Sequence, residues 1–324
     1  MTTQKHIVLA GGTGLMGRTL AEHFTRKGIP VIVLTRGKAG ERKGVTYIQW
    51  DPEHPRDLEQ HLNGAQAVFG LNGAIVDRRY NAKGKWTILH SRLSSTLALG
   101  DAIGRCSDPP EAWLQLSTAT IYRHAEDRPM DQYTGEIGEG FSVEVARSWE
   151  AVTTSFKLPN TRTVLLRSAM VMSPFGGVLP RLVQLTRAGL GGRHGSGEQF
   201  VSWIHADDLV GAVDHILGTK AEGIYDLAAP EPTRDGYLME QLRARFRPLL
   251  ALPQPKWMLE FGAFLLRTEP ELILKSRRVV PTRLLREGFR FAHPGITEAL
   301  VDLLGQERNM NMGHNIQDQL LTKG

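Results

Sequence analysis

Three regularly placed glycines follow a short apolar run near the start of the chain. Residues 7–10, Ile-Val-Leu-Ala, have the composition of a buried strand, and Gly11, Gly14 and Gly17 lead into a segment with apolar residues at helical spacing. This order is typical of a dinucleotide site, because the glycines permit a tight strand-to-helix turn and bring the backbone close to a pyrophosphate. The N–H groups at the helix start would then face the phosphates, although a glycine-rich turn without a ligand would have the same sequence. The predicted cofactor loop comprises Gly11, Gly12, Thr13, Gly14, Leu15, Met16 and Gly17.

The end of the second predicted strand indicates which cofactor is bound. Residues 31–34 form that strand, and Thr35 and Arg36 follow where a carboxylate would bind the ribose 2′-hydroxyl of NAD(H). No carboxylate stands there, whereas Arg36, with Lys38 and Arg42 further on, can donate charge-assisted hydrogen bonds to a 2′-phosphate. The same basic run would also suit a solvated surface loop. We therefore predict NADP(H) in preference to NAD(H).

Further strand-like runs predict the fold class. They occupy residues 46–50, 67–71, 112–117 and 163–166, and the segments between them are long enough for crossover helices. This pattern predicts an α/β fold with a Rossmann-type doubly wound parallel sheet. Ligands of such sheets bind at the carboxyl ends of the strands, so the residues after these runs should line one crevice. The expected cofactor-binding set is completed by Asn72, Gly73, Ala74, Arg92, Ser117 and Arg167.

Several motifs, taken in order along the chain, resemble a known family. They are Gly70-Leu71-Asn72-Gly73, Ser91-Arg92-Leu93-Ser94-Ser95-Thr96, Trp149-Glu150, Gly176-Gly177-Val178-Leu179 and the Ser-Trp-Ile-His-Ala-Asp-Asp run at 202–208. Over residues 5–304 the chain resembles atypical extended short-chain dehydrogenase/reductases of the NAD-dependent epimerase/dehydratase superfamily. The match is closest to an epimerase-like branch with a C-terminal domain of unknown function. The resemblance implies nicotinamide chemistry at a carbonyl or hydroxyl group, but a fold does not name a substrate.

Ordinary members of that family carry a Ser or Thr that holds the substrate oxygen and a Tyr-x-x-x-Lys pair that moves the proton. The lysine helps the tyrosine to ionise, since an unperturbed tyrosine, with a pKa of about 10, is a poor base at neutral pH. No such pair stands in the corresponding helix, where the two aligned positions hold Ser142 and Ala146. Ser117, next to Thr118 at a strand end, and Tyr122 are therefore the candidate catalytic residues. Either side chain would also suit a structural hydrogen bond.

The chain after residue 167 is expected to form a smaller, α-rich C-terminal lobe. We predict an NADP-binding Rossmann domain over residues 1–167 with a return segment near 200–228, a substrate lobe and appended module over 168–304, and a flexible tail over 305–324. Candidates for contact with an anionic substrate are Arg193 and His194, in a glycine-rich run that would suit either a lid or a surface loop, and His205. His205 would equally suit a structural role at a strand-to-helix junction.

Composition restricts the remaining classes of protein. The contents of 41% hydrophobic and 23% charged residues are ordinary globular values, and the net charge of +5 comes without a compact basic and aromatic stretch, so nucleic-acid binding is not expected. Cys106 is the single cysteine and the histidines lack metal-ligand spacing, so neither a disulfide nor a metal is expected. No apolar run reaches the roughly 18 residues of a membrane span, and we expect a cytoplasmic protein. By resemblance, helices near 82–104 and 140–156 would pair two copies in a homodimer.

Two functions follow from these observations. The first is an NADP(H)-dependent, epimerase-like oxidoreductase acting on a small carbonyl or hydroxyl substrate, with nucleotide sugars among the candidates. The second is an NADP(H)-binding sensor or regulatory protein without turnover, which the missing Tyr-x-x-x-Lys pair favours. The sequence leaves both open.

Overall fold

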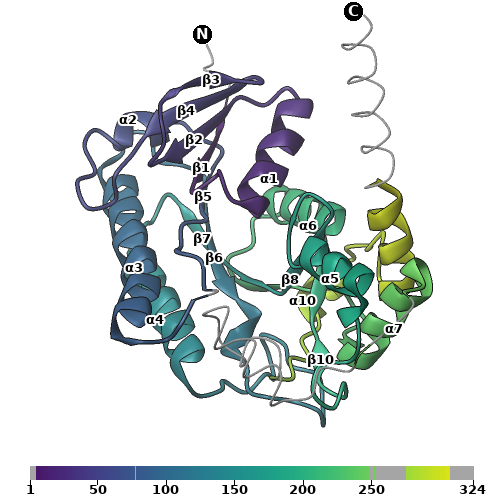
Figure 1. Ribbon diagram of the computed structural model, residues 1–324. Helices are drawn as coiled ribbons and strands as arrows, with labels where there is room; N and C mark the ends of the chain where they lie inside the picture. The colour runs from purple at the N-terminus through teal and green to yellow at the C-terminus, as the bar shows by residue number, and fades with distance from the viewer. Residues whose placement is uncertain (1–4, 77, 249–251, 253–274, 307–324) are drawn as a thin grey trace, which may run out of the picture.

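An eight-stranded sheet forms the centre of the computed structural model, which describes residues 5–76, 78–248, 252 and 275–306 (Figure 1). The strands are β1 (Ile7–Ala10), β2 (Val31–Thr35), β3 (Gly40–Arg42), β4 (Val45–Gln49), β5 (Ala67–Gly70), β6 (Ala112–Thr118), β7 (Arg162–Ser168) and β12 (Gly223–Leu227). Their order is β12-β7-β6-β5-β1-β2-β4-β3, and all neighbours are parallel except β3 and β4. The chain therefore reverses direction across the sheet between β1 and β5, the place where such sheets bind ligands.

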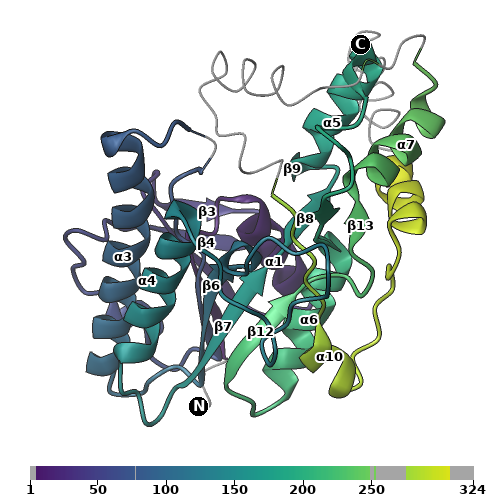
Figure 2. The ribbon, with the colours of Figure 1, turned by 90° about the horizontal axis from the view of Figure 1, so that it is seen from below.

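Helices cover both faces of this sheet (Figures 1 and 2). One face carries α2 (Glu59–Leu62), α3 (Ala82–Arg105) and α4 (Phe141–Ser155), and the other carries α1 (Leu15–Arg26) and α6 (Ala206–Gly218). The alternation of side chains along β1 supplies both cores, since Ile7 and Leu9 pack toward α1 and α6 while Val8 and Ala10 pack toward α3. This arrangement confirms the predicted Rossmann-type doubly wound sheet.

The second lobe lies beside the sheet (Figure 2). It contains β8 (Met170–Ser173), β9 (Gly176–Gly177), α5 (Leu179–Leu185), the π-helical turn η2 (Thr186–Leu190), β10 (Phe200–Val201), β11 (Trp203–His205), β13 (Thr233–Arg234), α7 (Asp235–Phe246) and a helix over 296–306. The short helix α10 (Thr282–Arg286) instead packs beside β12, with Leu284 in the core of the large sheet. The core of the second lobe joins α5, α7 and the helix 296–306 through buried leucines such as Leu182, Leu238 and Leu303. Between these parts the chain returns to the sheet, where β12 pairs with β7.

Two sequence expectations differ from, or fall outside, this description. The basic run after β2 contains an edge strand, β3, that was not predicted; its three residues are all exposed, so no apolar alternation marks it. The predicted flexible tail, 305–324, lies outside the described residues except for 305 and 306, which are helical. Within the part of the chain that the structure describes, no helix has both the length and the apolar character needed to cross a membrane.

Candidate functional site

The glycine loop between β1 and α1 is shaped by contacts that exclude side chains. A Cβ on Gly11, where φ is +82°, would lie 2.9 Å from the backbone nitrogen of Asn72, and a Cβ on Gly17 would lie 2.4 Å from the Cα of Gly12. Gly14 differs, because an added Cβ there would meet no atom closer than 3.8 Å. Gly14 is also the N-cap of α1, where no side chain caps the helix and no acidic residue stands in the first turn. The loop thus presents uncapped N–H groups at an open surface, as an anion site requires.

The predicted phosphate-binding arginine lies at the end of β2. Arg36 is exposed, and the hydroxyl of Thr35 accepts a hydrogen bond of 3.1 Å from the backbone N–H of Gly37, which fixes the turn that carries the arginine. Arg42, by contrast, lies on β3 with its guanidinium 5.2 Å from the ring centre of Tyr47. Arg36 is therefore better placed than Arg42 to bind a phosphate group of a ligand held at the loop after β1.

The turn after β5 lies against the glycine loop and rests on Arg92. The Arg92 guanidinium donates to the carbonyl oxygens of Ala74 at 3.2 Å and of Ile88 at 2.9 Å, and it lies 5.0 Å from the ring centre of Trp149. A Cβ on Gly73 would lie only 2.9 Å from its Cζ. Burial lowers the pKa of Arg92 to about 10, and no carboxylate among the described residues forms an ion pair with it. The predicted set of turn residues and arginine is thus one contiguous structure.

Both predicted catalytic residues belong to a buried polar network. Ser117 donates to Glu150 at 2.5 Å, and Glu150 forms a bidentate ion pair with Arg167 at 2.8 and 2.7 Å. Arg167 also donates to the Tyr122 hydroxyl at 2.9 Å, and that hydroxyl donates to Asp226 at 2.9 and 3.0 Å. These five side chains come from β6, α4, β7, β12 and the segment after β6, and together they tie that edge of the sheet to α4.

Burial sets the protonation of this network. Tyr122 is only 1% exposed and Ser117 only 2% exposed. Desolvation, followed by the nearby Asp226 charge, raises the pKa of Tyr122 well above its ordinary range, and desolvation raises the pKa of Asp226 to about 7. A tyrosine in this setting holds its proton, so it serves as a hydrogen-bond donor to Asp226 rather than as a base near neutral pH.

The neighbouring hydroxyl, Thr118, has a different setting. Because side chains alternate along a strand, Thr118 points away from Ser117, and it is half-buried. Its Oγ1 accepts from the backbone N–H of Thr120 at 3.2 Å and lies 2.8 Å from the Thr120 hydroxyl. The local sequence Ser-Thr does not show which of the two hydroxyls faces inward. That depends on Glu150, which lies on α4 against one face of the sheet.

Of the second-lobe candidates, Arg193 is exposed while both histidines are buried. His194 is held by Asp235, which accepts from its backbone N–H at 2.8 Å and pairs with its Nδ1 at 2.7 Å. The Gln199 side chain also donates to the carbonyl oxygen of His194 at 2.9 Å. The contacts of His194 with Asp235 and Gln199 therefore hold the glycine-rich run in place within the fold.

His205 lies in a cluster that joins α6 to the C-terminal helix. Its Nδ1 accepts from the backbone N–H of Asp207 at 3.0 Å, its ring stacks on His293 with a 3.8 Å centroid separation, and its Nε2 lies 3.2 Å from an Asp302 carboxylate oxygen. One ligand atom from each of these four side chains lies within 4.8 Å of the others. Since Nδ1 uses its lone pair as an acceptor, the neutral ring carries its hydrogen on Nε2, which lies near Asp302 but makes no hydrogen bond among the described residues. We interpret this cluster, the histidine joint, as a structural link.

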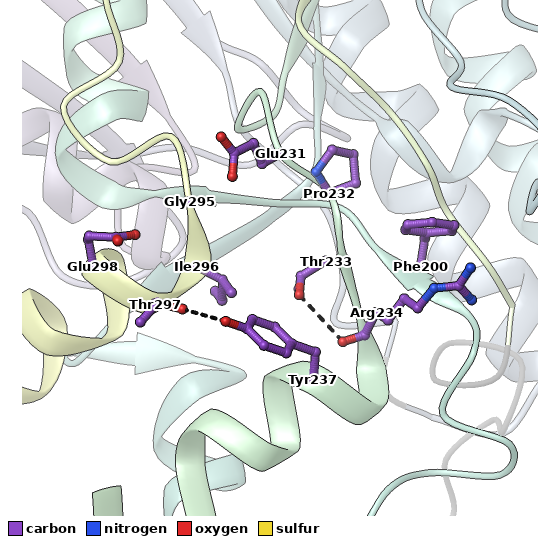
Figure 3. Close-up of a pocket in the computed structure, with 10 residues that line it drawn as sticks. All are labelled: Phe200, Glu231, Pro232, Thr233, Arg234, Tyr237, Gly295, Ile296, Thr297 and Glu298. Atoms are coloured by element: carbon purple, nitrogen blue, oxygen red, sulfur yellow. Dashed lines mark hydrogen bonds between the residues drawn. The ribbon is translucent and has the colours of Figure 1, made fainter. Parts of the chain in front are cut away.

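A separate pocket of about 520 Å³ opens within the second lobe (Figure 3). Its lining comes from β10, β13, α7 and residues near the start of the helix 296–306, and none of it belongs to the large sheet. The Tyr237 hydroxyl lies 3.0 Å from the Thr297 Oγ1 across the pocket. The side chains of Glu231 and Glu298 both lie close to Gly295. Its polar lining contains no residue predicted from the sequence, and we assign it no role.

The doubly wound sheet with its glycine loop at the reversal defines a Rossmann-type α/β protein. Residues 7–228 match the NAD dependent epimerase/dehydratase family, and residues 254–303 match a domain of unknown function, DUF1731. The chain therefore belongs to the NAD dependent epimerase/dehydratase family, which confirms the resemblance seen in its motifs.

Relatives and solved structures extend over nearly the whole chain. The epimerase family protein SDR39U1 of Bos taurus is 30% identical over 304 residues, covering 92% of this chain and 99% of that protein. The epimerase family protein SSP1921 of Staphylococcus saprophyticus is 29% identical over 306 residues, covering 93% and 99%. The crystal structure of human SDR39U1 (isoform2) with NADPH superposes with a TM-score of 0.81 at 27% identity, covering 92% of this chain and 98% of the human one.

Proposed function

We propose that this protein binds NADP(H) at the reversal of the sheet and uses it in an oxidoreductase or epimerase-like reaction on a small carbonyl or hydroxyl compound. The observation that carries the proposal is the loop between β1 and α1, where neighbouring backbone excludes side chains from Gly11 and Gly17 but leaves Gly14 open. Arg36 at the end of β2 selects the 2′-phosphate. The presence of NADPH in the human SDR39U1 structure supports this cofactor.

Different residues of the site would bind different parts of the cofactor. The uncapped N–H groups of α1, from Leu15 onward, bind the pyrophosphate, and Arg36 binds the 2′-phosphate. The turn at Asn72, held from behind by Arg92, lies next to the loop and would line the nicotinamide side of the site. When bound, NADPH supplies a hydride from its nicotinamide ring. The buried pair of Arg167 and Glu150 would support this surface from beneath.

Substrate orientation would fall to Thr118. Ser117 donates its hydroxyl to Glu150 and Tyr122 donates its own to Asp226, so each acts within the buried network. Thr118 is the half-buried hydroxyl of the pair at the end of β6 and remains the one able to turn toward a substrate oxygen. Arg193, exposed in the glycine-rich run, would meet an anionic group of the substrate.

A titration of the purified protein with NADPH and with NADH, followed by nicotinamide fluorescence, tests the cofactor proposal. We expect tighter binding of NADPH and a loss of that preference by about 10-fold or more, near 1.4 kcal/mol, in Arg36→Ala. Arg42→Ala removes the same charge from β3 and is the matched control, with a smaller expected effect. Equal affinity for the two cofactors, or an equal loss in both variants, would contradict the phosphate-binding role of Arg36.

The second candidate function is an NADP(H)-binding sensor without turnover. It is favoured by Ser142 and Ala146 on α4, which replace the proton-transferring pair, and by the inward orientation of Ser117 and Tyr122. The two functions differ in one measurement, the oxidation of NADPH by a panel of aldehydes and ketones. Oxidation that depends on the protein supports the enzyme, and tight NADPH binding without oxidation supports the sensor.

A further inference from the structure

The first turn of α4 is contacted by a tyrosine from a different segment of the chain. Tyr80 directly precedes Asn81, the N-cap of α3, whose side chain accepts a hydrogen bond of 2.8 Å from the Gly84 N–H. The Tyr80 ring packs edge-on against Phe141 with centroids 4.8 Å apart, and its hydroxyl lies 3.4 Å from the Ser142 Oγ. Because the Ser142 side chain is small, the Tyr80 phenol, which directly precedes α3, occupies the space beside the start of α4.

A half-buried cation, Arg92, acts on this phenol. The charge of Arg92 interacts with Tyr80, and this interaction raises the pKa of Arg92 against the larger effect of burial. Because such an interaction is mutual, Arg92 also favours the ionised form of the Tyr80 hydroxyl. Among the described residues its guanidinium contacts two backbone carbonyl oxygens and the Trp149 ring, and no carboxylate there pairs with it. A phenol that interacts with a cation is a combination that favours proton transfer from a tyrosine.

Arg92 also connects Tyr80 to the proposed cofactor site. The guanidinium donates to the carbonyl oxygen of Ala74, and the turn that contains Ala74 lies against the glycine loop, with Asn72 adjoining Gly11. Tyr80, half-buried and directly before α3, lies beside the start of α4, with its hydroxyl near the Ser142 Oγ. The start of α4 and the turn after β5 are thus linked through Tyr80 and Arg92.

We propose that Tyr80 is the proton donor of this site and that Arg92 is the positioning residue that stabilises its phenolate; this role rests on the proposed NADPH-dependent turnover. In the reductive direction the substrate carbonyl carbon accepts the hydride and the π electron pair moves to the oxygen. That oxygen takes the proton of Tyr80, and the O–H bond of the phenol breaks. The phenolate that remains beside Arg92 then takes a proton from water, which restores the starting state.

A tyrosinate titration of the full-length protein tests the pairing without any substrate. The chain has six tyrosines, and burial raises the pKa of two of them, Tyr122 and Tyr225. We expect one tyrosine to ionise ahead of the rest, seen as ultraviolet absorbance of phenolate, and we expect that early step to vanish in Tyr80→Phe and to move to higher pH in Arg92→Gln. Tyr237→Phe is the control and should keep the early step. If Tyr80→Phe and Tyr237→Phe give the same curve, the pairing is wrong.

Oxidation of NADPH with 4-nitrobenzaldehyde as the probe tests the proton-donor role. Tyr80→Phe keeps the ring that packs on Phe141, so NADPH affinity and thermal stability should stay at wild-type values while the rate falls by about 10²- to 10⁴-fold. The wild-type rate should decline as pH rises through the early tyrosine step, and the residual rate of Tyr80→Phe should not. Arg92→Lys keeps the charge and should retain more activity than Arg92→Gln.

The outcomes separate this inference from the proposed function. Absence of NADPH binding in the wild type would overturn both. Binding with a rate that is unchanged in Tyr80→Phe would overturn the proton-donor role alone and leave the NADPH-dependent enzyme in place. Binding without any oxidation would overturn turnover, and with it the role of Tyr80, in favour of the sensor.

Discussion

Glu150 on α4 holds Arg167 on β7 in a bidentate ion pair, with Nε to Oε1 at 2.8 Å and Nη2 to Oε2 at 2.7 Å. Both side chains are about nine-tenths inaccessible, and each has a second partner within the fold, Ser117 for Glu150 and Tyr122 for Arg167. The pair therefore connects a helix on one face of the sheet to the strand ends that carry the candidate site. These partners satisfy the two buried charges. Removing either Glu150 or Arg167 would therefore leave the charge of the other buried without its counter-ion.

Glu150→Gln should strongly destabilise the protein. The substitution keeps the shape of the side chain but leaves the buried Arg167 charge without its counter-ion, and breaking a buried pair in this way costs about 3–5 kcal/mol. Urea unfolding followed by circular dichroism measures the loss. Glu144→Gln, on an exposed position of the same helix, is the control and should change the free energy of unfolding by less than about 1 kcal/mol. Equal effects of the two substitutions would show that the pair adds little.

Asp226 should make the protein less stable as pH rises. Burial raises its pKa to about 7 in the folded state, so the folded protein holds this proton more tightly than the unfolded chain does. Its contribution to stability is then fully present below the ordinary carboxyl pKa of about 4 and is lost as pH rises through 7. Asp226→Asn cannot titrate and preserves an acceptor for Tyr122. The stability of the wild type relative to Asp226→Asn should therefore fall between pH values of about 5 and 8, and a rise over that interval would contradict the assignment.

The sequence predicted the elements that depend on local pattern. The glycines at 11, 14 and 17 and the strand runs follow from spacing and periodicity alone, and the structure places β1 and α1 at the glycine-rich segment. The orientation of Ser117 did not follow, because alternation along β6 shows that Ser117 and Thr118 face opposite sides but not which side holds Glu150. Strand β3 was missed because all three of its residues are exposed.

The approach of Tyr80 to Ser142 depends on tertiary structure. The two residues are 62 positions apart, and Tyr80 lies just before a helix, where no periodic pattern assigns a face. The only local signal is Asn81, a good N-cap residue, which fixes the point where α3 begins. The empty tyrosine and lysine positions on α4 showed that a group was missing, but only the fold shows which side chain lies beside them.

His205 should make the protein less stable in mild acid. Burial, followed by the neighbouring His293, lowers its pKa in the folded state, although Asp207, Asp208 and Asp302 act in the opposite direction. The unfolded chain then binds the proton more readily, so this contribution is present above the ordinary histidine pKa of about 6.5 and is lost as pH falls below it.

A variant that caps the helix without titrating isolates this effect. Asn is a good N-cap residue, so His205→Asn can still accept from the Asp207 N–H that Nδ1 accepts from in the wild type. The melting temperature of the wild type should fall more than that of His205→Asn between pH values of about 7.5 and 5.5. Parallel pH profiles of the two proteins would contradict a titrating role for His205 in the histidine joint.

Gly14 and Gly17 should separate cofactor binding from folding. A Cβ at Gly17 would lie 2.4 Å from the Cα of Gly12, a contact that forces backbone to move, so Gly17→Ala should lower both the melting temperature and NADPH affinity. A Cβ at Gly14 would meet no protein atom closer than 3.8 Å and would project over the open N-terminus of α1, where the pyrophosphate is proposed to lie. Gly14→Ala should therefore keep the wild-type melting temperature and weaken NADPH binding by about 10-fold or more. An unchanged NADPH affinity in Gly14→Ala would place the phosphates elsewhere, because no other property of the loop compensates for a methyl group on the surface that they must touch.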